Sequence, residues 1–483
     1  MSEAVRSLEP QALWNHFSDL NAVPRPSKKE ERVIEFIKQF GENLGLATKV
    51  DHIGNVIIKK PGQGGKENAS PIVMQSHLDM VHQKNADTDF DFEKEGIKML
   101  VDGDWVKADG TTLGADNGIG VASIMALLSS KDIPHPPLEA LFTIDEETGM
   151  TGAMELQGGH FDAKVLLNLD TEDDDELTIG CAGGIDVTAR GEFDMEACPE
   201  GFVGRKLKVA GLNGGHSGMD INKGLGNANK IMNRILLEGE QIGIRVSSID
   251  GGGLRNAIPR ESFTYIAIPV THVNAFEEYF GEIGGLIVDE YSTTDPDLEL
   301  VSEEADCPEK VMELGFQCQL LRAIQACPNG IYRMSPDVDG LVQTSNNLAR
   351  VHAEDGNYEV MCLTRSSVDS EKMDEANSIS SVFELIGAKV EMDGSYPGWT
   401  PKPGAEITKL MSSIYKERFG EEPHVMACHA GLECGILGTN YPDMEMISFG
   451  PNIRGAHSPD EKVQISSVQK YWGFLLETLE RMN

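Results

Sequence analysis

The apolar positions along the chain follow two spacings, which predict helices and strands in alternation. Residues 10–23 and 28–45 carry apolar side chains three and four positions apart, as amphipathic helices do. Residues 116–130 predict a buried helix, with Asp116 placed as its N-cap. Short apolar runs that predict strands lie at 55–60, 71–81, 138–145 and 164–170. Strands and helices in this order predict an α/β domain whose sheet is largely covered.

The pattern changes near residue 184, where strands become longer and alternate more regularly, as at 260–270 and 357–367. Helical segments lie between these strands, which is typical of an α+β arrangement. After about residue 398 the alternation of helix, strand and helix returns. The chain also exceeds the size at which single cores usually stop growing. We therefore expect one domain built from 1–183 plus 398–483, interrupted by an inserted domain over 184–397.

Composition narrows the possible partners. The formal net charge of −37 argues against nucleic acid and anionic membranes, because both bind clustered Lys and Arg. Eight scattered cysteines without metal-finger spacing are typical of reduced core thiols. The N-terminus shows no apolar signal region, and the longest apolar stretch, 118–130, is shorter than the ~20 residues of a membrane span. We expect a cytoplasmic, soluble protein, and a cation-binding site would suit its charge.

Three adjacent acids follow one of the apolar runs. The segment "LFTIDEETG" (141–149) places Asp145, Glu146 and Glu147 side by side. Adjacent carboxylates repel, and burying one without a partner costs several kcal/mol. The pattern therefore predicts positive charge beside this segment.

Other polar residues stand at comparable places. "SHLDMV" puts His77 and Asp79 two positions apart at a strand end, so that both side chains can share a face. A metal-bound imidazole commonly has its other N–H held by a carboxylate. Asp116 precedes a helix, Asp170 ends the run "VLLNLD", and His457 lies in a Gly/Pro loop. Taken singly, each has an ordinary structural explanation as a core residue, a helix cap or a surface group.

Taken together, these residues predict a metal site. Five of them fall at or just beyond the carboxyl ends of predicted strands, where α/β sheets form their sites: His77, Asp116, Glu146, Glu147 and Asp170. Two zinc ions would need about this many nitrogen and oxygen ligands, with one bridging carboxylate. Neighbours in a turn point in different directions, so Glu147 can bind metal while Glu146 acts as general base towards a metal-activated water. The chemistry indicated is peptide or amide hydrolysis.

The order of these motifs resembles a known group of enzymes. H-x-D, G-x-D-x-G, E-E-x-G, a strand-ending D and a C-terminal loop H resemble the co-catalytic zinc peptidases, the clan of carnosinases, aminoacylases and the carboxypeptidase-G group. The chain is most similar to the bacterial aminoacyl-histidine dipeptidases, also called peptidase D or cytosol non-specific dipeptidases. The segments that carry this resemblance are "SHLDMV", "TLGADNGIGVA", "FTIDEETGMTGA", "LLNLDTE", "GGHSGMDI", "MACHAGLECGIL" and "SFGPNIRGAHSPDE". The match covers essentially the whole chain.

The resemblance implies a zinc-peptidase catalytic domain with a mixed sheet flanked by helices, and makes the α+β insertion a lid. The lid is about twice as long as the simple lids of the clan, so it could fold as two subdomains. Two Zn²⁺ per subunit are implied, with Co²⁺ or Mn²⁺ as other candidates. Asp79 would orient His77, and Glu146 would accept the proton. The implied ligands are His77, Asp116 and Asp170 for one ion, and Asp116, Glu147 and His457 for the other.

The resemblance also assigns residues that would bind the substrate. His216 in "LNGGHSG" would stabilise the oxyanion, and Asn256 in "GGGLRNAIP" would contact the substrate. Arg365 in "CLTRSS" would hold the C-terminal carboxylate, which suits the forked geometry of a guanidinium. Gly431, in "CHAGLECG" at a predicted helix start, would offer a backbone N–H. His429 and Glu433 are weaker candidates nearby.

The implied function is a dipeptidase of broad specificity that acts on Xaa-His dipeptides, including β-alanyl-histidine. Its partners would be small dipeptides, without nucleic acid or membrane. The sequence does not decide whether the protein forms a homodimer, or whether His216 serves the active site of its own subunit or that of a partner. One alternative is an amidase of the same fold that acts on N-acyl amino acids. Another is a catalytically silent metal- or peptide-binding protein, against which Glu146 argues because a binder needs no base.

Overall fold

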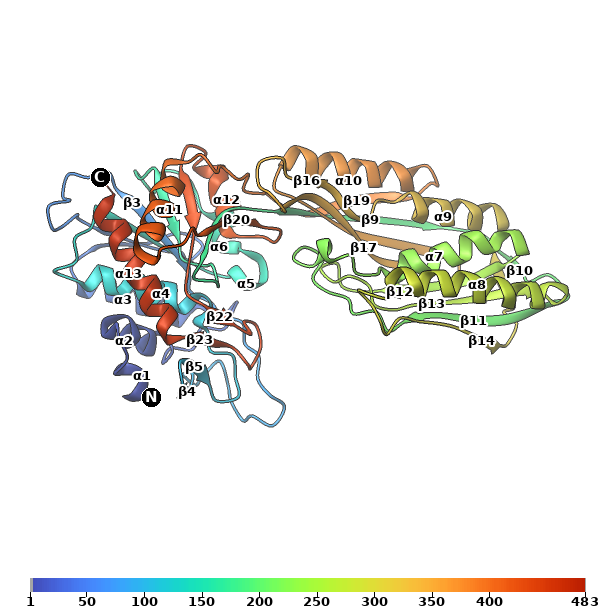
Figure 1. Ribbon diagram of the computed structural model, residues 1–483, viewed down its shortest axis with the longest axis horizontal. Coiled ribbons are helices and arrows are strands. Elements are labelled where there is room, and N and C mark those ends of the chain that lie inside the picture. Colours follow the sequence, from blue (N-terminus) through green and yellow to red (C-terminus); the bar gives the residue numbers. More distant parts are fainter. Residues whose placement is uncertain (1–2, 483) are drawn as a thin grey trace. The chain divides into compact units, whose positions relative to one another are not determined.

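The computed structural model describes residues 3–482, which divide into two compact units (Figure 1). Unit 1 comprises 3–180, Pro401–Ala427 and 432–482, and unit 2 comprises Cys181–Thr400 and Cys428–Gly431. The insertion expected over 184–397 lies within unit 2. The short segment Cys428–Gly431 also belongs to unit 2, although the sequence pattern placed it in the first domain.

Unit 1 is built on a mixed sheet with the strand order β1-β2-β6-β3-β7-β21-β8-β20. Strands β6, β3, β7 and β21 run parallel to one another, whereas β1 pairs with β2, β2 with β6 and β8 with β21 in antiparallel fashion. The α/β class and the mixed sheet expected from the sequence are thereby confirmed. The strands are β1 (Ala47–Val50), β2 (Val56–Lys60), β3 (Ile72–His77), β6 (Leu138–Thr143), β7 (Val165–Asn168), β8 (Glu176–Cys181), β20 (His424–Cys428) and β21 (Glu445–Ser448).

Helices cover this sheet and supply its core. The apolar side chains of α2, among them Trp14 and Phe17, lie three or four residues apart and are fully buried. Helix α4 is apolar on all sides because α2 contacts it on one side and β3 and β6 on another. The helices are α1 (Glu3–Arg6), α2 (Gln11–Leu20), α3 (Glu31–Asn43), α4 (Ala115–Ser129), α5 (Glu146–Gly149), α6 (Thr151–Glu155), α11 (Glu406–Phe419), α12 (Glu433–Asn440) and α13 (Ile465–Arg481).

The start of α4 differs from the sequence prediction. Gly114 takes the cap position with a left-handed φ of 69°, and no side chain caps the helix. Asp116 has non-helical dihedral angles (φ −80°, ψ 110°), so its carboxylate is directed away from the first turn. The prediction that Asp116 is the N-cap is therefore wrong.

A second, smaller sheet of unit 1 joins two distant parts of the chain. Its strand order is β22-β23-β5-β4, and β23 pairs with β5 in antiparallel register, Val463 opposite Val106. The strands are β4 (Met99–Asp102), β5 (Trp105–Ala108), β22 (Ile453–Arg454) and β23 (Lys462–Gln464). The segment that leads into α4 therefore starts from β5, and the loop between β22 and β23 ends at the neighbouring strand β23.

Unit 2 is an α+β layer structure. Its antiparallel sheet has the order β14-β11-β13-β12-β17-β18-β9-β19, and β16 adds to β17. The strands are β9 (Gly183–Glu192), β11 (Phe202–Ala210), β12 (Arg245–Gly252), β13 (Ser262–Pro269), β14 (Glu299–Ala305), β16 (Gly330–Met334), β17 (Val342–Glu354), β18 (Asn357–Ser366) and β19 (Lys389–Tyr396). Strands β10 (Met195–Ala197) and β15 (Lys310–Met312) form a separate pair.

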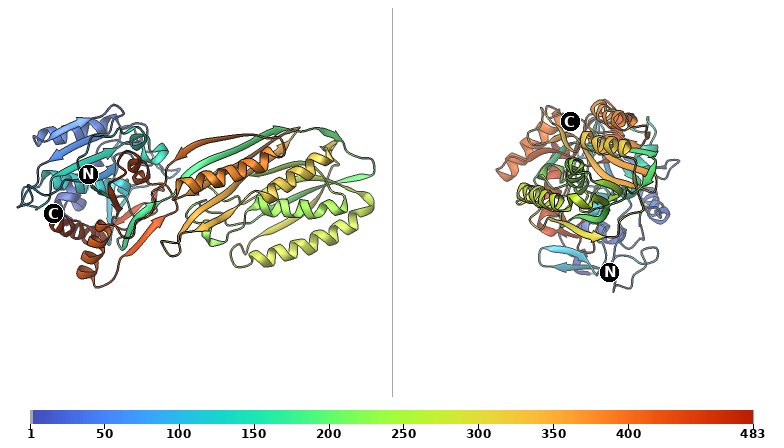
Figure 2. Two further views of the ribbon diagram at one scale, coloured as in Figure 1. Left: turned by 90° about the horizontal axis from the view of Figure 1, so that it is seen from above. Right: turned by 90° about the vertical axis from the view of Figure 1, so that its right-hand side faces the viewer.

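Four helices of unit 2 pack on its main sheet, and Figure 2 shows them lying alongside the strands. They are α7 (Ala228–Gly239), α8 (Val273–Tyr291), α9 (Leu314–Ala326) and α10 (Asp369–Glu384). Short 3-10 turns lie at Ile221–Lys223, Glu240–Ile242 and Val270–His272. Across residues 3–482, no helix has both the length and the apolar character needed to cross a bilayer.

Gly120 provides a test of how closely α4 packs. A Cβ at this position would overlap Asn117 Oδ1 and Ser76 Oγ and would lie 2.9 Å from the Leu169 carbonyl oxygen. We expect Gly120→Ala to lower the free energy of unfolding by about 1–3 kcal/mol, because these neighbours must shift. Urea denaturation followed by circular dichroism measures the change.

Gly281 in α8 is the matched control, because nothing lies within 4 Å of a Cβ built there. Gly281→Ala should raise the free energy of unfolding by about 0.5–1 kcal/mol, the usual helix preference for Ala over Gly. Equal stability of Gly120→Ala and the native protein would contradict the packing at α4.

Candidate metal centre

The predicted site residues of unit 1 gather at one edge of its larger sheet. Strands β6, β3 and β7 are adjacent and parallel, so their carboxyl ends meet there. His77 is the last residue of β3, Glu146 and Glu147 follow β6, and Asp170 lies two residues beyond β7. The sheet thus brings together residues that are up to 93 positions apart in the chain.

Two loops complete the group. Asp116 stands at the start of α4, and His457 lies between β22 and β23 with a left-handed φ of 63°. His77 Nε2 is 3.2 Å from Asp116 Oδ1 and 3.5 Å from Asp170 Oδ1. His457 Nε2 is 3.3 Å from Asp116 Oδ2 and 3.0 Å from Glu147 Oε2. The two oxygens of Asp116 therefore face different histidines.

These contacts define two sets of potential metal ligands. One set is His77, Asp116 and Asp170, and the other is Asp116, Glu147 and His457. Within each set, one donor atom per residue lies within 4.8 Å of the others. Imidazole nitrogens and carboxylate oxygens are ligands that Zn²⁺ and similar ions accept, and the shared Asp116 has the place of a bridging carboxylate.

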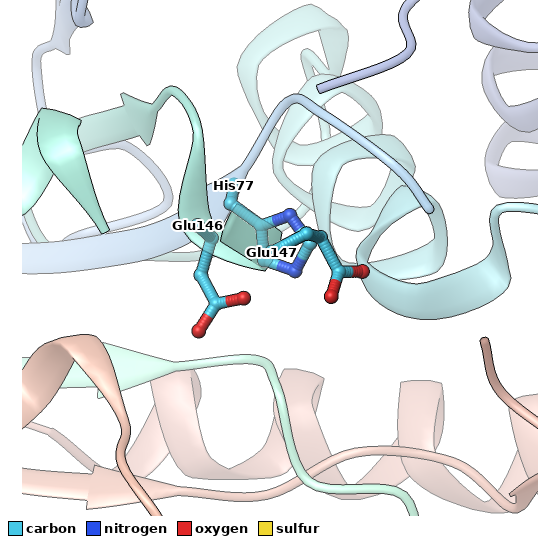
Figure 3. Close-up of side chains that lie close together, drawn as sticks. All are labelled: His77, Glu146 and Glu147. Atoms are coloured by element: carbon cyan, nitrogen blue, oxygen red, sulfur yellow. The ribbon is translucent and has the colours of Figure 1, made fainter. Parts of the chain in front are cut away.

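Glu146 lies beside both sets. It forms a third close group with His77 and Glu147, and the carboxylates of Glu146 and Glu147 point in different directions (Figure 3). The backbone N–H groups of both glutamates donate to Asp79, at 3.0 and 3.2 Å. Asp79 Oδ1 also lies 3.3 Å from His77 Nδ1. Asp79 therefore contacts the turn that carries the glutamates as well as the histidine.

Asp145 has a partner of its own. Its carboxylate pairs with Lys28 Nζ at 2.9 Å and accepts hydrogen bonds from Thr148 and Thr151. It lies near Glu30 and Asp79, but its oxygens are already used by these donors. Of the three adjacent acids, Glu146 and Glu147 belong to the candidate metal groups, and Asp145 is paired with a lysine. The sequence spacing did not distinguish them.

The electrostatics of the group show a shortage of positive charge. Burial raises the pKa of Glu146 well above its usual value and also raises the pKa of Glu147. Burial alone would raise the pKa of Asp116, but hydrogen bonds from His457 and His77 hold it below its usual range. Hydrogen bonds to Asp116 and Glu147 raise the pKa of His457 to about 11. Protons on the histidines are thus the counter-charge when no cation is bound.

The donor set passes a simple test for metal binding. Glu147 Oε1 is buried and has no hydrogen-bond partner among residues 3–482, whereas its Oε2 faces His457. A buried carboxylate oxygen without a partner is costly unless a cation or proton fills the place. The crowded carboxylates, the imidazoles and this orphaned oxygen fit a pair of divalent cations.

The predicted substrate-binding residues lie in unit 2. His216 Nδ1 accepts the backbone N–H groups of Gly218 and Met219, at 3.2 and 3.0 Å. Arg365 is 5% exposed, and its Nη1 donates to the Tyr396 hydroxyl at 2.7 Å. A Cβ at Gly218 would lie 3.2 Å from both Arg365 Cδ and His216 Cε1, so these two side chains flank one glycine.

Other predicted residues of this group are placed differently. Asn256 is exposed, and its carbonyl oxygen accepts the Ser217 N–H at 2.8 Å, beside His216. Gly431 is not at a helix start, because α12 begins two residues later at Glu433. The expected helix N-terminus at Gly431 is therefore wrong.

His429 and Glu433, the weaker candidates, fall in different units. Buried His429 has its Nε2 2.7 Å from Ser345 Oγ. Buried Glu433 accepts hydrogen bonds from Gln75 and Thr143, at 2.6 and 2.7 Å.

Several residues that shape these groups carry no signal in the sequence. Lys28, Ser345 and Tyr396 make their contacts across 117, 84 and 31 positions respectively, with no characteristic spacing. Glu461 could have been suspected, because it ends the segment "HSPDE" four residues after His457.

Comparisons with known proteins agree with this geometry. Residues 73–481 match the model of peptidase family M20/M25/M40. The chain is 43% identical to the cytosol non-specific dipeptidase of Escherichia coli strain K12, over 100% of this chain and 99% of that protein. The crystal structure of aminoacylhistidine dipeptidase from Vibrio alginolyticus is similar with a TM-score of 0.94 and 43% identity, covering 100% and 98% of the two chains.

A more distant structure shares the fold. Aminopeptidase PepT from Bacillus cereus has a TM-score of 0.57 and 16% identity, covering 98% of each chain. The family match extends over most of the sequence, and the edge of the sheet that it includes carries the two ligand sets. The resemblance expected from the motifs is confirmed, and the chain belongs to peptidase family M20/M25/M40.

Proposed function

We propose that the protein is a dizinc dipeptidase that hydrolyses the peptide bond of Xaa-His and other dipeptides, including β-alanyl-histidine. The observation that carries this proposal is the pair of ligand sets sharing Asp116, with the Glu146 carboxylate beside them. The two relatives that share 43% identity with this chain are named as dipeptidases. One of these names also refers to the cytosol, and we propose the same compartment for this chain.

Zn²⁺ is the cation we propose, with Co²⁺ and Mn²⁺ as alternatives. His77, Asp116 and Asp170 would hold one ion, and Asp116, Glu147 and His457 the other. When bound, such ions polarise a carbonyl group and lower the pKa of water towards neutrality. The remaining chemistry falls to side chains of the protein.

Glu146 is proposed as the residue that moves the proton. Its carboxylate points away from that of Glu147, so it is free to face an attacking water (Figure 3). Burial raises its pKa, which makes the carboxylate a better proton acceptor. It would take the proton of the water and pass it to the leaving amine. Asp79 would hold both the Glu146 backbone and the His77 ring in place.

The hydrogen bonds of His216 set its tautomer. Its Nδ1 accepts two backbone N–H groups, so the ring proton of the neutral imidazole lies on Nε2. Burial and the nearby Arg365 lower its pKa, which keeps the ring neutral. The Nε2–H can then donate to the oxyanion that forms from the scissile carbonyl, the role we propose for it.

Arg365 is proposed to bind the carboxylate end of the dipeptide. It is a buried cation, and no carboxylate lies within ion-pair distance of it in residues 3–482. Its Nε has no hydrogen-bond partner in the same range. A buried guanidinium without an anion favours an anionic ligand. Asn256 and Gly431 are proposed as further contacts, with support from the family resemblance.

The proposal is the same whether the residues of unit 2 come from the same chain or from the second subunit of a homodimer. An amidase acting on N-acyl amino acids would use the same ligand sets, but the names of the similar proteins favour free dipeptides. A silent binding protein would have no use for Glu146.

The role of Glu146 is tested by Glu146→Gln. We expect kcat for a dipeptide to fall by about 10²–10⁴-fold, because the amide accepts no proton. Metal content, measured by mass spectrometry, should stay at two ions per chain. Glu155→Gln, at an exposed position of α6, is the matched control and should retain full activity. An active Glu146→Gln enzyme with both ions bound would show that the base is another residue.

The role of Arg365 is tested by Arg365→Lys, which keeps the charge but loses the forked donors. We expect KM for β-alanyl-histidine to rise by about 10–100-fold, the effect of losing one to two charge-assisted hydrogen bonds. Arg350→Lys is the control, because Arg350 pairs with Asp250 elsewhere in unit 2. Faster release of histidine from N-acetyl-histidine than from β-alanyl-histidine would instead identify an amidase.

A pH-dependent stability of unit 2 follows from His429. Burial, reinforced by Arg365 and His216, lowers its pKa to about 3, against about 6.5 in an unfolded chain. Between these values the unfolded chain binds a proton that the folded chain does not, so stability is lost as the pH falls through this window. As the pH falls, the free energy of unfolding of the native protein should decrease faster than that of His429→Gln. The difference in slope should reach about 1.4 kcal/mol per pH unit.

Denaturant unfolding of both proteins at several pH values between about 6.5 and about 4 measures this difference. The His429→Gln side chain can keep the hydrogen bond to Ser345 but does not titrate. Parallel stability curves for the two proteins would mean that folding does not lower the pKa of His429.

A further inference from the structure

One buried carboxylate binds the whole turn that leads into Asp116. Glu461 Oε2 accepts the N–H groups of Leu113 and Gly114, at 2.7 and 2.9 Å. Its Oε1 accepts those of Ala115 and Asp116, at 2.7 and 3.3 Å. Glu461 is 2% exposed and belongs to neither ligand set. Four successive backbone N–H groups thus donate to the side chain of Glu461, which lies 345 or more positions away in the chain.

The same residue belongs to the loop of His457. It lies four positions after His457, and its own N–H donates to the Ser458 carbonyl at 3.1 Å, which closes the loop. The adjoining strand β23 is paired with β5, from which the Asp116 turn departs. Glu461 therefore links the backbone that carries Asp116 to the backbone that carries His457.

A buried arginine holds the same turn from another direction. Arg25 Nη1 donates to the carbonyl oxygens of Leu78 and Asp79, both at 3.0 Å, just after His77. Its Nη2 donates to the Gly114 carbonyl at 2.6 Å. Burial lowers the pKa of Arg25 to about 10, so it stays charged at neutral pH. Across residues 3–482, no carboxylate lies within ion-pair distance of Arg25.

Gly114 is where the two side chains meet the backbone. Its N–H goes to Glu461 and its carbonyl to Arg25. Its left-handed φ of 69° favours glycine, and a Cβ there would lie 2.5 Å from Arg25 Nη2. The carboxylate of Glu461 and the guanidinium of Arg25 therefore bind backbone groups of two segments, 78–79 and 113–116, and Glu461 itself lies in a third segment, the loop of His457.

We propose that Glu461 and Arg25 are positioning residues that hold the Asp116 turn at a set spacing from His77 and His457. The two cation sites would then be formed before the cations bind, because the hydrogen bonds of Glu461 and Arg25 do not involve the cations. Buried charges are expensive, and apolar residues would stabilise a core at lower cost. Their use on backbone groups next to ligands is expected where geometry matters more than stability. This inference rests on the proposed function.

The test is metal binding by Glu461→Gln. The amide keeps the size of the side chain, but its NH₂ group faces N–H donors and cannot accept from them. We expect Zn²⁺ affinity, measured by competition with a chromophoric chelator, to fall by about 10–100-fold, as for other residues that orient metal ligands. The visible absorption of the Co²⁺-loaded protein should also change, because it reports ligand geometry.

Glu139→Gln is the matched control. Glu139 is a buried carboxylate of unit 1 that accepts two backbone N–H groups, from Asp162 and Ala163, at the opposite end of β6. The Glu139→Gln variant should be less stable than the native protein but should keep its affinity for Zn²⁺ and the visible absorption of its Co²⁺-loaded form. Equal loss of affinity in both variants would reduce Glu461 to a general structural role and would overturn the inference.

Arg25→Lys gives an independent test if Glu461→Gln does not fold. The lysine keeps the charge but cannot reach all of the carbonyl oxygens at once, so the same loss of affinity is expected. A folded variant of either residue with native affinity and spectrum would overturn the inference. Failure of the unaltered protein to bind two cations would instead overturn the proposed function.

Discussion

Repulsion between carboxylates at the edge of β6, β3 and β7 is the constraint on which the rest of the site depends. Asp116, Glu147 and Asp170 converge there with two histidines, and the Glu146 carboxylate lies alongside. Without cations, protons on the imidazoles balance part of this charge, as the raised pKa of His457 indicates. Divalent cations offer more charge in the same space. Such an arrangement would be stabilised by metal binding.

The surrounding structure limits how many acids the metals must neutralise. Asp145 is paired with Lys28, and Asp79 is held by Ser27 and by two backbone N–H groups. Glu461 accepts hydrogen bonds from the backbone N–H groups of residues 113–116. Each of these carboxylates has its own donors, so they shape the ligand turns without competing for cations. Acids close in space thereby divide into those that belong to the two candidate ligand sets and those that accept hydrogen bonds or ion pairs from other groups.

Much of this was accessible from the sequence because local patterns carry the information. The buried strands that end at His77 and Asp170 are short apolar runs, and their parallel pairing places both residues at one edge. The amphipathic spacing around Trp14 likewise predicts α2. The motif order led to the peptidase family, which the comparison with family models supports over residues 73–481.

The rest depends on contacts that no local pattern encodes. The sequence pattern predicts Asp116 as a helix cap, but Gly114 takes the cap position. The carboxylate of Asp116 contacts the two histidines instead. Arg25 reads as an ordinary charged residue near a helix, yet it is fully buried on carbonyl groups 53 to 89 positions away. The short segment up to Gly431 joins unit 2 although its neighbours in sequence join unit 1. Each case is decided by tertiary packing.

Anomalous X-ray diffraction at the zinc edge, on crystals of the protein grown with Zn²⁺, tests the central claim most directly. We expect two anomalous peaks per chain at the carboxyl edge of β6, β3 and β7, with Asp116 between them. His77 and Asp170 should bind one ion, and Glu147 and His457 the other. A single peak, or peaks away from Asp116, would contradict the account.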